Sequence, residues 1–389
     1  MRCAYINAEI LTSGQWHTGL AVLVENGKIS DIIPRGDLPS GMIAHDLRRH
    51  RLVPGFVDLQ VNGGNGILFN EDPSVATLRR IAEAHWQYGT TAFLPTLISD
   101  DLAKVRKAIS AVTMAIAAGV PGIVGIHIEG PFLNIDRRGI HASEMIRPVD
   151  AQGLDTILPV IGGRTLLTLA PECISMNDLR VLLDRGIIVS AGHTSGSYEE
   201  IYSAFDAGVV GATHLFNAMP PLANREPGAV GAALSHPDCW CCLIVDGKHV
   251  HPATMRIALK AKGGVGRFIL VTDAMPTVGQ SVKQFKLNGG DISVIDGVCQ
   301  DEAGTLAGSD LDMAKAVSNA VQMLGVSLAE AVQMAAENPA TYLGMNDRFG
   351  TLEVGKAANM VEMDRDGRVV QTWIEGNTVW CKNARRNVA

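Results

Sequence analysis

The middle of this chain alternates short apolar runs with amphipathic segments, and this alternation limits the possible folds most strongly. Eight runs are typical of strands, and they begin at Val53, Thr90, Gly122, Thr165, Gly186, Gly208, Cys241 and Arg267. Between them apolar residues recur at helical spacing, as in Leu102, Val105 and Ile109. Near-continuous apolar strands that alternate with helices indicate a parallel sheet buried on both faces. Eight such units predict an α/β protein with a (β/α)8 barrel.

The two ends of the chain follow a different pattern, of short strands and tight turns. Near the N-terminus, Asn26-Gly27 lies between two apolar runs and predicts a type I′ hairpin. Near the C-terminus, we expect turns at Asp366-Gly367 and Gly376-Asn377. We therefore predict a barrel over residues 53–345 and a small β domain from residues 1–52 plus 346–389.

One helix start in the last part of the barrel region has a capping signature. Ser309 and Asp312 have the spacing of a capping box. We expect a helix to begin there.

Composition excludes several classes of protein. Of the 389 residues, 47% are hydrophobic and 19% charged, which excludes a disordered chain. The net charge of −7 argues against nucleic acid as a partner. The first residues show no signal-peptide pattern, and no apolar run approaches the ~18 residues of a membrane span. Seven cysteines, an odd number without framework spacing, predict reduced thiols in a cytoplasmic protein.

Polar side chains gather where the predicted strands end, which is where catalytic groups of such barrels lie. Glu129, His193 and His214 could supply one carboxylate and two imidazoles from three strands. This set leaves a position open for water, as in catalytic zinc sites, and the metal would lower the pKa of that water toward ~7. Asp273, at the end of the eighth strand, could then accept the water proton as general base.

Other residues of these types have simpler interpretations. His127 alternates with Glu129 and so faces the barrel interior, where we favour a packing or supporting role over a ligand role. For Glu172 we favour an anchoring role in a loop. The cysteines of the CWCC segment lack metal-site spacing, so we expect Cys239, Cys241 and Cys242 to pack in the core.

An ordered set of motifs runs through the whole barrel region and carries a strong resemblance. It comprises VPGFVDLQVNG, GIHIEGPFLN, LAPE, VSAGHTS, ATHLFNAMPP, NREPGAVGA, DGKHV, LVTDAM and GTLAGSDLDM. The chain resembles the N-acetylglucosamine-6-phosphate deacetylase family of the amidohydrolase superfamily. That resemblance implies a barrel flanked by a small β-sandwich that both chain ends build. It also implies hydrolysis of the acetamide of N-acetylglucosamine 6-phosphate to glucosamine 6-phosphate and acetate.

The same resemblance implies roles for individual residues. A metal would bind Glu129, His193 and His214, Asp273 would act as acid and base, and His141 would polarise the acetyl carbonyl. The implied substrate contacts are Asn217, the Ala218 backbone, Arg225 and His249. Arg225 and His249 would hold the phosphate, and Arg225 would come from the neighbouring subunit of a homodimer. Because Arg225 lies in a Pro/Gly loop, a guanidinium there suits phosphate binding.

One departure from the superfamily pattern affects the metal count. Many amidohydrolases have His-x-His at the end of the first barrel strand, whereas this chain has Gln60 and Asn62. Amide oxygens are poor ligands for a zinc-like ion, so we expect one divalent metal per subunit. Zn2+ is the first choice, and Fe2+, Mn2+ and Co2+ also suit the ligand set.

Three functional hypotheses remain open from the sequence. The first is deacetylation of N-acetylglucosamine 6-phosphate. The second is a related substrate, N-acetylgalactosamine 6-phosphate or another amide. The third is a non-catalytic binding barrel, which predicts the loss of a ligand or of Asp273, and all of these residues are present.

Overall fold

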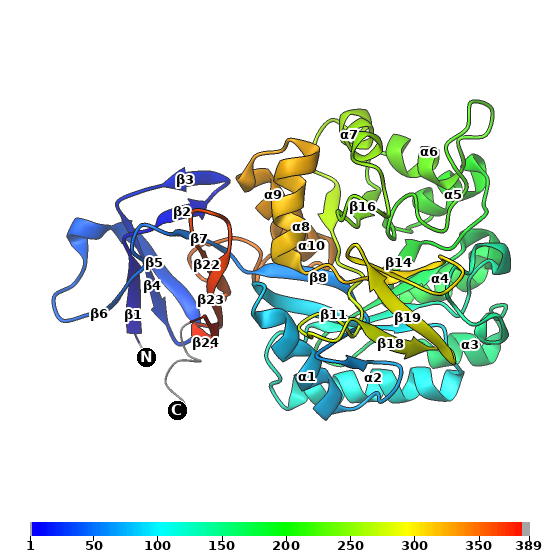
Figure 1. Cartoon of the computed structure of the whole chain (residues 1–389), viewed down its shortest axis with the longest axis horizontal. Helices are drawn as coiled ribbons and strands as arrows, with labels where there is room; N and C mark the ends of the chain where they lie inside the picture. Colours follow the sequence, from blue (N-terminus) through cyan, green and yellow to red (C-terminus); the bar gives the residue numbers. More distant parts are fainter. Residues whose placement is uncertain (1, 383–389) are drawn as a thin grey trace.

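Two units lie side by side in the computed structural model, which describes residues 2–382 (Figure 1). The larger unit is an eight-stranded parallel sheet in which each strand pairs with the next along the chain, and this confirms the predicted (β/α)8 barrel. Its strands are β8 (Phe56–Val61), β11 (Thr90–Ile98), β12 (Gly125–Glu129), β13 (Arg164–Leu169), β14 (Ile188–Ala191), β15 (Gly211–Ala212), β16 (Trp240–Leu243) and β17 (Phe268–Leu270).

Helices surround this sheet because they bury apolar side chains, and most of them begin at a polar N-cap. In α1, Leu78, Ile81 and Ala82 are buried, and the Ser74 side chain accepts from the backbone of Thr77. The helices are α1 (Val75–Trp86), α2 (Leu102–Ala117), α3 (Ala151–Thr156), α4 (Met176–Asp184), α5 (Tyr198–Asp206), α6 (Gly228–Ser235), α7 (Pro252–Ala261), α8 (Met313–Asn319), α9 (Leu328–Ala335) and α10 (Glu337–Tyr342).

The first and last barrel strands meet just beyond their carboxyl ends. Val61 and Ala274 form an isolated parallel bridge, and the Ala274 carbonyl accepts from the backbone amides of Asn62 (2.9 Å) and Gly63 (3.0 Å). The barrel is thus closed at the end where the polar strand-end residues lie.

The smaller unit consists of strands from both ends of the chain. A four-stranded sheet has the order β5-β4-β1-β6 and a six-stranded sheet the order β24-β23-β22-β7-β2-β3. These strands are β1 (Arg2–Ile6), β2 (Glu9–Thr12), β3 (Gln15–His17), β4 (Leu20–Glu25), β5 (Lys28–Pro34), β6 (Ile43–Asp46), β7 (Arg51–Pro54), β22 (Met360–Met363), β23 (Val369–Ile374) and β24 (Asn377–Cys381).

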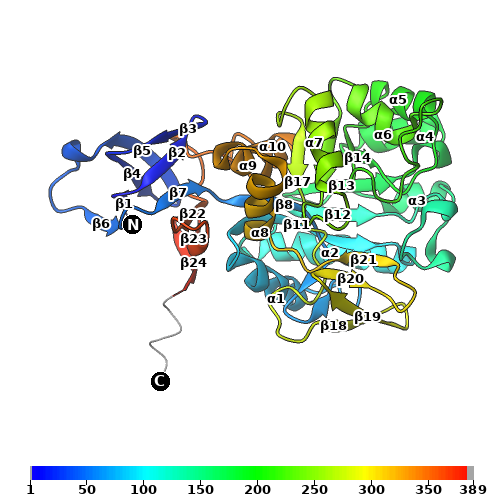
Figure 2. The same ribbon diagram turned by 45° about the horizontal axis from the view of Figure 1, so that its top comes forward.

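Pairing between strands from the two chain ends holds this unit together, and the unit lies beside the barrel in Figure 2. β7 pairs with the C-terminal strand β22, and Tyr5 packs edge-on against Trp373 with ring centroids 5.0 Å apart. The boundary expected between residues 52 and 53 falls within β7. The division of the chain into domains stays a prediction.

Two of the predicted turns differ in their outcome. Asn26 and Gly27 both have positive φ, 51° and 80°, and join β4 to β5, so the predicted type I′ hairpin is confirmed. The turn expected at Gly376-Asn377 is wrong by one residue, because Ile374 pairs with Asn377 and Glu375-Gly376 form the turn. Glu375 adopts a φ of 49° in this turn, a backbone conformation that the sequence pattern does not predict for a glutamate.

A four-stranded antiparallel excursion between β17 and α8 was not expected from the sequence. It consists of β18 (Gln284–Leu287), β19 (Gly290–Ile295), β20 (Val298–Gln300) and β21 (Leu306–Ser309), and lies against the barrel near α2 in Figure 2. The capping box predicted at Ser309 is wrong, because Ser309 ends β21. Asp312 itself caps α8, accepting from the backbone of Lys315.

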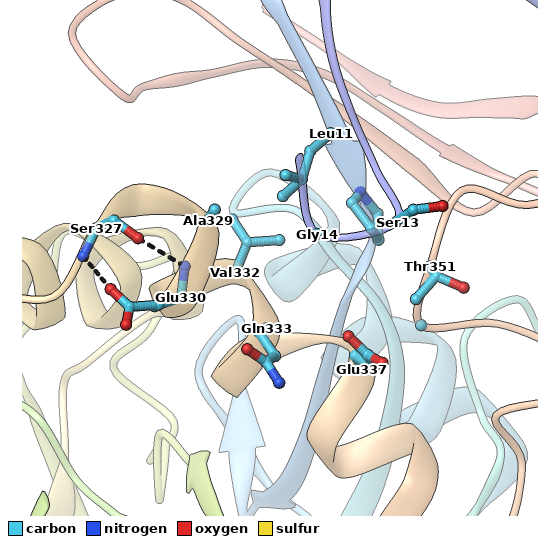
Figure 3. Close-up of a pocket in the computed structure, with 12 residues that line it drawn as sticks. Leu11, Ser13, Gly14, Ser327, Ala329, Glu330, Val332, Gln333, Glu337 and Thr351 are labelled. Atoms are coloured by element: carbon cyan, nitrogen blue, oxygen red, sulfur yellow. Dashed lines mark hydrogen bonds between the residues drawn. The ribbon is translucent and has the colours of Figure 1, made fainter. Parts of the chain in front are cut away.

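A cavity of about 150 Å³ separates the two units near the turn between β2 and β3 (Figure 3). Leu11 and Ser13 face Val332, Gln333 and the nearby α10 across it. Ser327 and Glu330 bond reciprocally as the capping box of α9. No histidine or cysteine of the described chain lines this cavity.

Cysteines behave as the sequence suggested. Cys239, Cys241 and Cys242 are buried in the barrel core, and all seven cysteines are free. Within residues 2–382, no helix has both the length and the apolar character needed to cross a membrane.

Candidate metal centre and active-site pocket

Three side chains from separate strand ends converge inside the barrel mouth. Glu129 is the last residue of β12, and His193 and His214 lie two residues beyond β14 and β15. Glu129 Oε1 lies 3.2 Å from His193 Nε2 and 3.0 Å from His214 Nε2, and the two Nε2 atoms are 3.1 Å apart. Ligands held ~2.1 Å from one tetrahedral zinc ion would be ~3.4 Å apart. The cluster therefore fits one divalent cation.

Supporting contacts leave the ligand atoms free to face such a cation. His193 Nδ1 lies 2.8 Å from the Arg137 carbonyl oxygen, which only accepts, so Nδ1 carries the proton and Nε2 keeps its lone pair. Burial alone would raise the pKa of Glu129. The contacts that the Glu129 carboxylate makes with His193 and His214 outweigh burial and hold its pKa well below its usual range. The carboxylate is thus charged, as a metal ligand must be.

Backbone strain concentrates at this site. His193, His214 and Asp273 have φ values of 48°, 31° and 52°, in a region that non-glycine residues seldom adopt. Such residues cost about 1–3 kcal/mol each and persist only where the surroundings hold them. Each follows its strand closely, so the strained turn directs its side chain over the barrel opening.

Asp273 lies three residues beyond β17, the last barrel strand. The Asn62 side-chain amide donates to its Oδ1 at 2.6 Å. Burial raises the pKa of Asp273, and the nearby Glu129 charge raises it further. A raised pKa suits a carboxylate that must both accept and return a proton near neutral pH.

Gln60 and Asn62 act as amide donors toward these carboxylates. Gln60 Nε2 donates to Glu129 Oε1 at 3.0 Å, just as Asn62 donates to Asp273. The Asn62 side-chain oxygen has no hydrogen-bond partner among the described residues. The number of metal ions therefore stays a prediction.

His141 lies deeper in the loop after β12, with its ring centroid 4.5 Å from that of His193. The Ser99 backbone amide donates to His141 Nδ1 at 3.2 Å, so Nδ1 has no proton and Nε2 carries it. Burial, and then the charge of His193, lower the pKa of His141 to about 3. The ring is therefore neutral and presents an N–H within 3.8 Å of Glu129 Oε2.

Glu172 anchors two loops of the site, as the sequence suggested. Its carboxylate accepts from Thr194 Oγ1, from the Ser195 amide at 2.6 Å and from Asn134 Nδ2 at 3.0 Å. The first two lie directly after His193, and Asn134 lies in the loop that carries Arg137. Glu172 thus ties the backbone that holds His193 to the carbonyl that orients its ring.

His127 lies one layer below the ligands, as expected of a supporting residue. Its ring lies between Thr96 Oγ1 (3.3 Å) and Thr168 Oγ1 (2.8 Å), and burial lowers its pKa to about 4. It is therefore a neutral side chain within a buried hydroxyl network.

A cavity of about 290 Å³ opens above the ligands. Asn217, Ala218 and His249 line it together with Asp273 and His141. His249 Nδ1 is 2.6 Å from Asp246 Oδ2, which fixes the ring. Arg225 is exposed and does not line the cavity of its own chain.

Sequence reasoning missed several groups of this cavity. Ser99, which bonds His141, follows the second barrel strand, so the strand-end rule could have found it. Thr305 and Leu306 reach the cavity from the excursion that was not predicted. Arg137 also lines it, from a short helical turn whose sequence carries no recognisable signal.

Comparisons with known proteins extend this description. The model of the "Amidohydrolase family" matches residues 51–379. An N-acetylgalactosamine-6-phosphate deacetylase from Shewanella sp. (strain ANA-3) is 39% identical over 377 residues, 96% of this chain and 95% of that protein. An N-acetylglucosamine-6-phosphate deacetylase from Haemophilus influenzae is 35% identical over 386 residues, 98% of this chain and all (100%) of that protein.

Solved structures show the same similarity. The N-acetylglucosamine-6-phosphate deacetylase from Pasteurella multocida superposes with a TM-score of 0.92 at 35% identity, covering 97% of this chain and 99% of that one. A mutant of the Mycobacterium smegmatis enzyme, in complex with N-acetyl-D-glucosamine-6-phosphate, gives a TM-score of 0.88 at 29% identity over 97% of this chain and 99% of that one.

The family match covers the barrel and the small-unit strands β7, β22 and β23. The barrel, the three converging ligands and the strand-end carboxylate agree with it. The chain belongs to the amidohydrolase family.

Proposed function

We propose that this chain hydrolyses the acetamide of N-acetylglucosamine 6-phosphate to glucosamine 6-phosphate and acetate. The observation that carries the proposal is the convergence of Glu129, His193 and His214 beside Asp273 and His141 in one cavity. The names of the relatives in Haemophilus influenzae and Pasteurella multocida support the substrate class.

Glu129, His193 and His214 would hold one divalent metal ion in this site. The chemistry that such an ion would supply is Lewis-acid activation of water. We propose Zn2+, because one carboxylate and two imidazoles with an open position form a common catalytic zinc set. Fe2+, Mn2+ and Co2+ accept the same ligands.

The side chains of this chain move the protons of the reaction. Asp273 accepts a proton from the attacking water as the new C–O bond forms. His141 Nε2–H donates to the carbonyl oxygen as negative charge develops there, a contribution of about 3–4 kcal/mol for a well-placed donor. Asp273 then returns the proton to the nitrogen as the C–N bond breaks, so that a neutral amine leaves.

Asn217, the Ala218 backbone and His249 supply the substrate contacts in this proposal. All three residues line the cavity, and the Asp246 carboxylate orients the His249 ring. Arg225 reaches the phosphate of the neighbouring subunit in a homodimer. Its exposure, outside the cavity of its own chain, supports that arrangement.

N-acetylgalactosamine 6-phosphate is a second candidate substrate. The Shewanella relative at 39% identity carries that name, and the two sugars differ only at C4. We also propose a cytoplasmic location, which the seven free cysteines support.

Acetate release by purified, metal-replete protein tests the proposal. We expect release from N-acetylglucosamine 6-phosphate, and a fall in kcat of about 10²–10⁴ in Asp273→Asn, the usual range for a general acid–base. The exposed Asp184→Asn on α4 is the matched control. A preference for the C4 epimer would select the second candidate. Turnover retained in Asp273→Asn would contradict the acid–base role.

A further inference from the structure

Arg137 stands apart among the groups around the cavity. It is the only lysine or arginine among the described residues that line it, beside the carboxylates of Glu129, Asp136 and Asp273. The cavity of a single subunit therefore contains one permanent cation. A sugar phosphate carries about −1.5 to −2 charges near neutral pH, as other phosphate monoesters do.

The guanidinium of Arg137 is only partly engaged by the protein. Its Nε donates to Ser195 Oγ at 3.2 Å. Within residues 2–382, Arg137 forms no salt bridge. The arginines that do are Arg2, Arg51, Arg147, Arg185, Arg267 and Arg368. Its two terminal nitrogens can therefore form the paired hydrogen bonds that suit phosphate oxygens.

The backbone around Arg137 is fixed, so its position is preorganised. The Arg137 carbonyl orients His193, and its amide donates to the Asn134 carbonyl at 3.0 Å. On the other side, Ser195 donates its amide to Glu172. The side chain is half-buried between these anchored segments.

Two of the proposed substrate contacts, Asn217 and the Ala218 backbone, lie on the same rim of the cavity. Thr194, next to Ser195, donates its amide to the Ala218 carbonyl at 3.2 Å. Ser195, which holds the Arg137 guanidinium, therefore lies beside the Asn217–Ala218 segment. On this geometry we propose that Arg137 binds the substrate phosphate from within the subunit. This inference rests on the proposed function and adds a cation to it that is independent of Arg225.

Steady-state kinetics of Arg137→Gln separate this role from a structural one. We expect KM for N-acetylglucosamine 6-phosphate to rise at least tenfold, with kcat within threefold of wild type. For unphosphorylated N-acetylglucosamine, kcat/KM should change less than twofold. Arg137→Lys keeps the positive charge but lacks the planar guanidinium. We expect its KM for N-acetylglucosamine 6-phosphate to lie between those of wild type and Arg137→Gln. Arg180→Gln, an exposed arginine on α4, is the matched control and should match wild type for both sugars.

Two further measurements use no turnover by the variant. Arg137→Gln should retain one metal per chain, because only its backbone contacts His193. In an Asp273→Asn background, calorimetry should show at least tenfold weaker binding of N-acetylglucosamine 6-phosphate when Arg137→Gln is added.

Each alternative outcome is decisive. An equal fall for the phosphorylated and unphosphorylated sugars would assign Arg137 a structural role and overturn the inference. Unchanged binding and KM would also overturn it while leaving the proposed function intact. If wild type hydrolysed the phosphorylated and the unphosphorylated sugar equally well, this inference and the proposed function would both be overturned.

Discussion

The Thr272 hydroxyl donates a 2.5 Å hydrogen bond to the Asp58 carboxylate, across the seam between the last and first barrel strands. The same carboxylate accepts from the backbone amides of Gln60 and Thr272, each at 3.2 Å. Thr272 directly precedes Asp273, and Gln60 lies two residues before Asn62. Asp58 therefore holds together the two strands that position the proposed acid–base residue.

Stability should depend on pH through this buried carboxyl group. Burial raises the pKa of Asp58 to about 7, against the hydrogen bonds from Thr272 and Gln60, which lower it. The folded protein thus keeps the Asp58 proton up to higher pH than the unfolded chain. The resulting stability is complete below about pH 4, where the unfolded carboxyl is also protonated, and is lost as pH rises through about 7.

Asp58→Asn imitates the protonated carboxyl and should remove this dependence. We expect the Tm of wild type to fall relative to that of Asp58→Asn between pH 5 and pH 8. Each kcal/mol of lost stability lowers Tm by about 2–4 °C in domains of ~150–250 residues, and by less in longer chains. Thermal unfolding of both proteins in the same metal state measures the difference. A pH-independent difference would show that Asp58 does not titrate in this range.

Metal content should depend on His193. His193→Ala removes one of three converging ligand atoms, so we expect the variant to lose tight binding of one metal per chain. Elemental analysis after dialysis against a chelator is the measurement. His17→Ala, in β3 of the small unit, changes a histidine far from the site and should retain the metal. One tight metal per chain in His193→Ala would refute the ligand set.

Glu172 should influence metal affinity without contacting the metal. Glu172→Ala removes the acceptor for Thr194, Ser195 and Asn134, so the loop that orients His193 loosens. Loss of such a supporting contact typically costs about 10–100-fold in affinity. Chelator competition compares this variant with the exposed Glu199→Ala on α5. Equal affinities in the two variants would show that the loop holds its shape without Glu172.

Subunit mixing tests the proposed homodimer. Arg225→Gln lacks the arginine donated to the partner, and Asp273→Asn lacks the acid–base group. In a mixed dimer, one site has an intact Asp273 and receives Arg225 from the other subunit. We therefore expect activity to recover when the two inactive variants are unfolded and refolded together. No gain over the separate variants would mean that Arg225 does not act across an interface.

The spacing of apolar residues along the chain predicted the barrel, because apolar side chains occupy the buried positions of its strands and helices. Strands such as Thr90–Ile98 are buried along their whole length, and helices such as Leu102–Ala117 bury one face, so both leave a clear signal. The strand-end rule then predicted the convergence of Glu129, His193 and His214. Strand order follows chain order in this barrel, so neighbouring strand ends are neighbours in space.

Contacts that depend on the course of the loops could not be predicted from the spacing of apolar residues. The link from Glu172 to Ser195 and the position of Arg137 depend on where irregular segments run, which has no period. Strands β18–β21 were missed because they are short and two of them, β18 and β19, contain only one buried residue each. The bond from Thr272 to Asp58 forms only once the barrel is closed, so the sequence pattern does not predict it.

The pairing of β7 with β22 has a consequence for synthesis on the ribosome. Residues Arg51–Pro54 emerge early, but their antiparallel partner Met360–Met363 emerges only after the entire barrel has been translated. At ~5–20 residues per second, the edge of β7 waits roughly 15–60 s for that partner. Unpaired strand edges invite wrong pairing, so the nascent chain is most open to aggregation and to chaperone capture during this interval.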